Sequence, residues 1–173
     1  MGAEIADAAE LAIRTFLDQR SVSHLLHELR DGERTTAFKT VLRDCARNLM
    51  FKVAASRCDA DEGEWLYDMV WYRNSRDGYY EEQGAVIECE WRNGIPVASS
   101  DEVDGDFQKL VQARADLRIW ICTIPNLELA KRHIANCIAQ IQRFRGTVRG
   151  DSYLFVILIW SHDEYYIERY DVA

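Results

Sequence analysis

Three acidic side chains have the spacing that metal-assisted chemistry requires. Glu88 and Glu90 alternate with apolar residues, so both carboxylates point to one face of an expected strand, about 6–7 Å apart. Asp68 occupies the polar face of a second expected strand. If the connection between the two strands is a hairpin symmetric about Gly78, Asp68 lies directly opposite Glu88 and shares its face. The pattern therefore predicts three carboxylates converging within a few ångströms.

Adjacent carboxylates repel one another, and a hard cation that takes oxygen ligands would compensate for them. Mg²⁺ or Mn²⁺ is the natural choice, since such ions are held by one or two carboxylates, water and substrate phosphate. The bound ion lowers the pKa of its water and neutralises charge that develops on phosphorus. The alternative is an amphipathic strand whose polar face simply meets water.

Hydrophobic periodicity predicts the elements that position these acids. The apolar spacing is helical near the N-terminus and changes to strand-like alternation after residue 48. Asn126 is an expected helix N-cap. The expected helices are 3–17, 23–29, 34–47, 104–116 and 127–144, and the expected strands are 49–56, 65–73, 84–92, 117–124, 153–160 and 165–171. This order predicts one α/β domain over residues 1–173, built on a mixed sheet.

The segment from Arg34 to Ile124 resembles the PD-(D/E)xK nuclease superfamily, whose restriction-endonuclease-like core runs helix, three strands, helix, strand (αβββαβ). Asp68 matches the family's acid on the second strand, and Glu88-Cys89-Glu90 matches its acid-x-base pair on the third. The resemblance implies that Asp68 and Glu88 bind metal with help from the backbone carbonyl of Cys89. It leaves an N-terminal helical segment at 1–33, and a helix and β-hairpin at 125–173, as additions to the core.

The chain departs from the family pattern at the lysine, which is replaced by Glu90. Some restriction enzymes carry glutamate there, so Glu90 would be a third ligand or would orient the attacking water. In some relatives the lysine comes from the following helix, where Lys109 is the candidate. The alternative for Lys109 is a solvated helix position.

Net charge limits the partners of the protein. The chain has 21 basic and 29 acidic residues, a net charge of −8, which argues against broad nonspecific binding to nucleic acid. The charge is uneven, because residues 59–106 carry 14 acids and 3 bases whereas residues 126–150 carry 5 bases and 1 acid. Three arginines of the basic segment are candidate phosphate contacts: Arg143, Arg145 and Arg149.

The cysteines and the apolar runs indicate the compartment. The five cysteines are an odd number and form no C-x-x-C pair, which is typical of a reducing, cytoplasmic environment. The longest apolar run, at 153–160, is too short to span a bilayer.

The first functional hypothesis is a metal-dependent nuclease or phosphodiesterase acting on nucleic acid, in the first place DNA. Asp68, Glu88 and Glu90 would hold one or two Mg²⁺ or Mn²⁺ ions, with Lys109 as a further catalytic group. The rival is a non-catalytic interaction protein on the same scaffold, either an adaptor or an acidic inhibitor of the immunity-protein type. Oligomeric state and the identity of a protein partner stay open.

Overall fold

A computed structural model describes residues 2–19, 26–91, 105–159 and 164–173 of the chain. Its elements are α1 (Gly2–Leu17), α3 (Asp31–Asn48), β1 (Lys52–Ala55), β2 (Met69–Asn74), β3 (Tyr80–Glu90), α4 (Gly105–Gln112), β4 (Leu117–Ile124), α5 (Leu127–Arg143), β5 (Ser152–Ile159) and β6 (Glu164–Asp171). Within those ranges, no helix combines the length and the apolar character needed to cross a membrane. The expected helix at 23–29 and the expected end of a strand at Trp160 fall partly or wholly outside the described residues.

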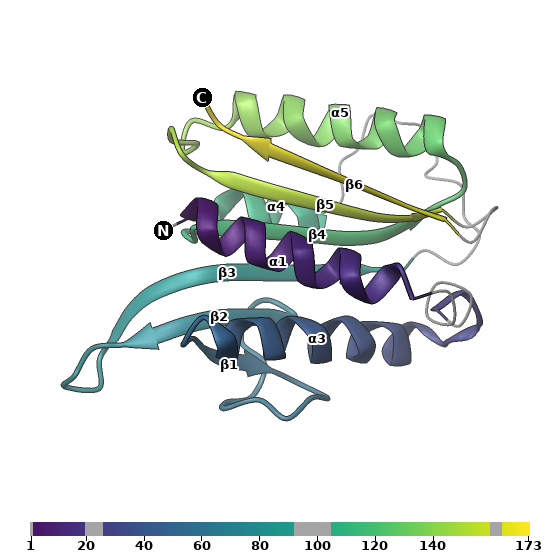
Figure 1. Cartoon of the computed structure of the whole chain (residues 1–173). Helices are drawn as coiled ribbons and strands as arrows, with labels where there is room; N and C mark the ends of the chain where they lie inside the picture. Colours follow the sequence, from purple (N-terminus) through teal and green to yellow (C-terminus); the bar gives the residue numbers. More distant parts are fainter. Residues whose placement is uncertain (1, 20–25, 92–104, 160–163) are drawn as a thin grey trace.

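The six strands form one mixed sheet in sequence order, β1 to β6. β1, β2 and β3 are antiparallel neighbours, β3, β4 and β5 are parallel, and β6 returns antiparallel to β5. Helices α1 and α3 lie side by side over one face, while α4 and α5 lie on the other side of the sheet (Figure 1). The prediction of an α/β domain on a mixed sheet is therefore confirmed.

Two apolar cores, one on each face of the sheet, explain this layering. β4 and β5 are buried along their whole length, as expected for parallel strands covered by helices on both sides. Their side chains alternate between the core under α1 and α3, which contains Ile119 and Val156, and the core under α4 and α5, which contains Trp120 and Phe155. The mostly apolar sequence of these strands, broken in β4 by Arg118 and Thr123, thus follows from burial on two faces.

Helix ends are set by local capping. Asn126 caps α5, its side-chain oxygen accepting a hydrogen bond from the Leu129 N–H at 2.9 Å, as predicted. Asp31 and Gly32, a pair of residues that favours turns, instead lie in the first turn of α3. The Glu33 carboxylate accepts a hydrogen bond from the Arg30 N–H at 2.9 Å, which satisfies a free donor at that helix end. An acidic first turn also matches the positive end of the helix dipole.

The β2–β3 hairpin has the predicted register near its base. Met69 pairs with Ile87 and Val70 with Val86, as a hairpin symmetric about Gly78 requires. Two register shifts follow toward the tip, and Gly78 adopts a φ of 85° in the turn. The predicted strand boundaries were wrong here: β2 begins at Met69 rather than Trp65, and β3 begins at Tyr80 rather than Gly84.

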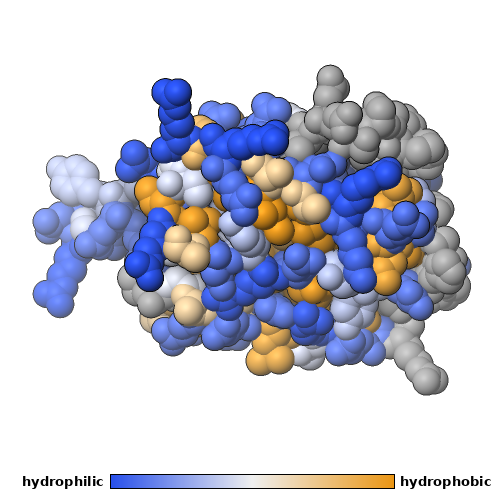
Figure 2. Space-filling model, turned by 90° about the horizontal axis from the view of Figure 1, so that it is seen from above, coloured by the Kyte–Doolittle hydropathy of each residue, from blue (hydrophilic) through white to orange (hydrophobic). Residues whose placement is uncertain are grey.

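The face viewed in Figure 2 is mostly hydrophilic, and its hydrophobic residues appear as separate small areas divided by polar ones. Scattered apolar exposure of this kind is ordinary for a folded chain.

Candidate functional site

Asp68 and Glu88 come together at the base of the β2–β3 hairpin, as the sequence predicts. Asp68 immediately precedes β2, and the pairing of Met69 with Ile87, continued by one residue, sets Asp68 opposite Glu88. The Cys89 N–H donates a hydrogen bond of 2.9 Å to Oδ2 of Asp68. This bond fixes the Asp68 carboxylate against β3, although Asp68 itself lies in a bend and not in the strand.

Glu88 is a buried carboxyl group with incomplete compensation. The residue is only 6% exposed, and Oε1 has no hydrogen-bond partner among the described residues. Burial raises the pKa of Glu88 to about 8, and the charge of Asp68 adds to the rise. A buried acceptor without a partner is unusual in a folded protein and calls for an explanation, such as an ion that binds there.

Lys109 lies beside Glu88, as predicted, but its closer partner is on its own helix. Nζ of Lys109 is 3.8 Å from Oε1 of Glu88 and 2.5 Å from Oδ1 of Asp106. The hydrogen bond to Asp106 is the main cause of a raised pKa at Lys109. The side chain of Lys109 is 41% exposed, so its ammonium group stays accessible to solvent and to a ligand.

A second lysine reaches the site from α3, and sequence reasoning missed it. Lys39 is buried, and its Nζ lies 2.9 Å from Oε2 of Glu64 and 3.3 Å from Oδ1 of Asp68. The signal in the sequence was slight: Lys39 is spaced by three residues from Leu42, which is on the apolar side of the helix. Its partners are 25 and 29 positions away, so only the fold brings them together.

Glu90 was predicted from the sequence to be a third metal ligand. It follows Glu88 by two residues on β3, pairs with Cys122 of β4 and is half-buried. In the described part of the chain, no group of three or more His, Cys, Asp or Glu side chains is arranged to hold a metal ion. The structure therefore shows a pair of carboxylates, Asp68 and Glu88, and not a cluster of three.

The residues present could supply only a few of the ligands of a divalent ion. Two carboxylates and a backbone carbonyl leave most coordination positions to water and substrate phosphate, which is how Mg²⁺ is commonly bound. Oε1 of Glu88, which accepts no hydrogen bond from the described residues, is the atom that such an ion would satisfy. The thiol of Cys89 is not an alternative nucleophile, because burial raises its pKa well above the usual range.

Alternation along the expected strands places Trp65, Trp71 and Trp91 on the face opposite the acids, and the structure differs from this expectation at one of them. Trp71 and Trp91 pack on the opposite face of the sheet, as expected. Trp65 does not: it is 41% exposed, and its ring lies 4.9 Å from that of Tyr72 and 5.8 Å from that of Tyr80. The bend before β2 turns Trp65 out of the strand pattern, which explains the error.

The three arginines predicted to contact phosphate are exposed but distant in the fold from the carboxylates. Arg143 ends α5, and Arg145 and Arg149 lie in the connection to β5, at the edge where β4 and β5 begin. They form no hydrogen bond or ion pair with other residues that the structure describes. Comparison of the chain with protein-family models, with curated proteins and with solved structures found no match.

Proposed function

We propose that the protein is a metal-dependent phosphodiesterase acting on nucleic acid, with DNA as the first substrate to test. The observation that carries the proposal is the pair of Asp68 and Glu88, in which a buried carboxylate oxygen has no hydrogen-bond partner in the described structure. The element order also supports it, since α3, three antiparallel strands, α4 and the parallel strand β4 follow one another as in the PD-(D/E)xK core.

Each residue of the site has a role in this proposal. Asp68 and Glu88 hold Mg²⁺ or Mn²⁺ with the Cys89 carbonyl, and the bound ion supplies an activated water and neutralises charge on the phosphate. The Cys89 N–H and Lys39 fix the Asp68 carboxylate by contacts of 2.9 and 3.3 Å. Lys109, the exposed cation beside Glu88, contacts a phosphate oxygen and stabilises the charge that develops there.

A second candidate function has an observation of its own. Lys39 pairs with Asp68 and Lys109 lies near Glu88, so the four groups also form a polar cluster with compensating charges. Such a cluster suits a non-catalytic interaction protein, in which the acids serve solubility or a basic partner. The two candidate functions differ in metal binding, which only the phosphodiesterase requires.

The test is calorimetric titration with Mn²⁺ at pH 8, without and with a DNA oligonucleotide whose phosphorothioate linkages resist cleavage. Because substrate phosphate completes many Mg²⁺ sites, the second arm detects an ion that binds only with substrate. We expect a saturable site that Glu88→Gln abolishes and Glu81→Gln preserves. Glu81 is the matched control, an exposed acid on the same strand.

Two outcomes would contradict the proposal. One is the absence of saturable heat in both arms for the wild type. The other is unchanged metal affinity in the Glu88→Gln variant with its fold intact by circular dichroism. Either result favours the interaction protein.

A further inference from the structure

The two edges of the sheet differ in how their outward backbone groups are satisfied. β1 is only four residues long, and the segment that follows it folds back along its outer side. The carbonyl oxygen of Val53 accepts hydrogen bonds from the N–H groups of Asp61 and Glu62, at 2.9 and 3.1 Å. The N–H of Ala55 donates to the carbonyl oxygen of Glu62 at 3.1 Å. The chain itself therefore covers the β1 edge and closes it to other strands.

β6 forms the opposite edge of the sheet (Figure 1). It pairs with β5 over eight residues without a register shift. Val172, directly after β6, makes two backbone hydrogen bonds of 2.9 Å to the turn before β5. Because backbone groups alternate in direction along a strand, the N–H and C=O groups of Tyr165, Ile167 and Arg169 point away from β5. In the part of the chain that the structure describes, no backbone group bonds to them.

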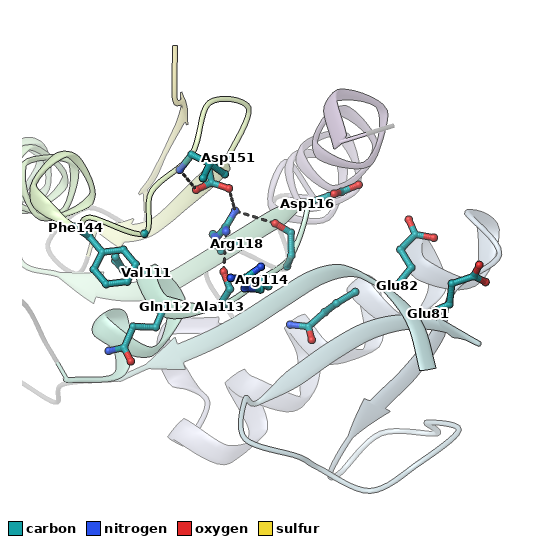
Figure 3. A pocket seen from close by; sticks show the side chains of 14 residues that line it. Glu81, Glu82, Val111, Gln112, Ala113, Arg114, Asp116, Arg118, Phe144 and Asp151 are labelled. Atoms are coloured by element: carbon teal, nitrogen blue, oxygen red, sulfur yellow. Dashed lines mark hydrogen bonds and ion pairs between the residues drawn. The ribbon is translucent and has the colours of Figure 1, made fainter. Parts of the chain in front are cut away.

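Side-chain contacts hold the end of β6 in place. The Ser152 hydroxyl donates a hydrogen bond of 2.6 Å to the Asp171 carboxylate, which ties the last residue of β6 to the first of β5. The turn before β5 is fixed by the ion pair of Arg118 and Asp151, 3.0 Å apart, which line a cavity of about 510 Å³ together with Phe144 (Figure 3). A strand that is already ordered loses little conformational entropy when another strand pairs with it.

Side chains on the α1 side of β6 fit antiparallel pairing with a second copy of the same strand. Tyr165 and Ile167 face the core under α1 and α3. With a two-fold axis at Ile167, perpendicular to the sheet, Tyr165 of each copy lies opposite Arg169 of the other and shares its face. An arginine beside a tyrosine ring is a favourable cation–π pair. The outward N–H and C=O groups of the two strands also face one another, which gives about six backbone hydrogen bonds.

Side chains on the α5 side fit the same register. Glu168 of each copy lies opposite Tyr166 of the other, and the ring of Tyr166 is 5.8 Å from Nζ of Lys131. The pairing therefore brings the carboxylate of one copy toward a lysine of the other. Neighbouring registers are less favourable, because an axis at Glu168 or at Arg169 sets two like charges directly opposite. An axis at Tyr166 sets Glu164 opposite Glu168.

We propose that the protein forms a homodimer through the outer edge of β6, in which two six-stranded sheets join into one, with the two-fold axis at Ile167. A two-fold interface requires a self-complementary surface. β6 meets this requirement, because the same strand supplies the tyrosine and the arginine that lie opposite one another, and α5 supplies the lysine for Glu168. The inference goes beyond the proposed function and does not rest on it.

The test combines sedimentation velocity of the whole chain, from about 5 to about 500 µM, with amide hydrogen exchange followed by NMR at both ends of that range. We expect a monomer–dimer equilibrium within the range. Exchange at the outward amides of Tyr165, Ile167 and Arg169 should slow as the concentration rises. Exchange at Tyr166 and Glu168, whose amides bond to β5, should be slow at every concentration.

Two variants of Tyr165 interrupt the pairing and leave the bonds between β5 and β6 intact. Tyr165→Lys sets a cation opposite Arg169 at both ends of the contact and should weaken dimerisation at least about tenfold. Tyr165→Pro removes an outward N–H that β5 does not use, which an edge strand tolerates, and should block pairing. The matched control is Tyr79→Lys, at a residue 76% exposed in the β2–β3 connection, which should dimerise like the wild type. Thermal unfolding of each variant checks its fold.

Three outcomes overturn the proposal. One is a monomer at every concentration. Another is a dimer that both Tyr165 variants leave unchanged, since it would form through a different surface. The third is exchange at the outward amides that does not depend on concentration. None of these outcomes bears on Mn²⁺ binding at Glu88, so the proposed function is tested separately.

Discussion

Replacing Glu88 by glutamine tests the central claim about the site, that a carboxyl group is buried there with too little compensation. The substitution keeps the shape of the side chain and removes its ability to ionise. Glu88 is 6% exposed, and burial raises its pKa from an ordinary value of 4.5 to about 8. The folded chain therefore holds a proton on Glu88 at pH values where the unfolded chain has released it.

This difference sets both the sign and the size of the effect. Because the folded state binds more protons between pH 4.5 and about 8, the free energy of unfolding falls as pH rises through that window. The slope is about 1.4 kcal/mol per pH unit. From pH 5.5 to pH 8 the wild type should thus lose about 3 kcal/mol relative to Glu88→Gln. Below pH 4.5 the contribution vanishes, and well above pH 8 the loss is constant.

The assay is urea unfolding at a series of pH values for the wild type, Glu88→Gln and the exposed control Glu81→Gln. The difference between wild type and Glu88→Gln should grow with pH, while Glu81→Gln should follow the wild type. Saturating Mn²⁺ at pH 8 should stabilise the wild type by about 3 kcal/mol at 100 times its dissociation constant, and the variant not at all. Parallel pH curves for wild type and Glu88→Gln would refute the reasoning.

Two further predictions concern the cation that pairs with Asp68 and the packing of the hairpin against the core. Lys39→Met leaves Asp68 and Glu64 without the cation that they share, and it should lower the free energy of unfolding by about 1–3 kcal/mol. The loss is smaller than for fully buried partners because both acids are partly exposed. Urea unfolding that matches the wild type would show that the pairing is unimportant. Gly84→Ala places a methyl group 2.5 Å from the Phe51 ring and should cost about 1–3 kcal/mol, whereas Gly63→Ala, with open space around it, should cost far less. Comparable melting temperatures for the two glycine variants would contradict that packing argument.

The location of the acids could be predicted because it depends on local rules. Alternation along a strand puts Val86 and Glu88 on one face, and a single assumption about hairpin symmetry was enough for the register of Met69 with Ile87. β4 was predicted with its exact limits and α5 with its cap, since a mostly apolar stretch and an asparagine before a helix are strong signals. These features require no knowledge of the remote chain.

The sequence predictions were wrong where contacts between distant segments, and not the local pattern, decide the structure. Trp65 and Asp68 were placed in a strand because the aromatic sequence alternates, yet the chain bends there and Asp68 bonds instead to the Cys89 N–H. Lys39 looked like an ordinary helix position because its partner Glu64 lies on a loop 25 residues away. Alternation cannot reveal a bend, and helical spacing cannot reveal a partner on another element.

The sequence by itself determined the α/β class, the order of elements along the chain and the placing of Asp68 opposite Glu88. Each follows from periodicity or from residues close to one another along the chain. Only the tertiary structure decided the burial of Glu88, the second lysine at Asp68 and the cavity bordered by Phe144 and Arg118. Burial and cavities depend on which segments pack together, and a pKa depends on burial, so neither can be known before the helices are laid on the sheet.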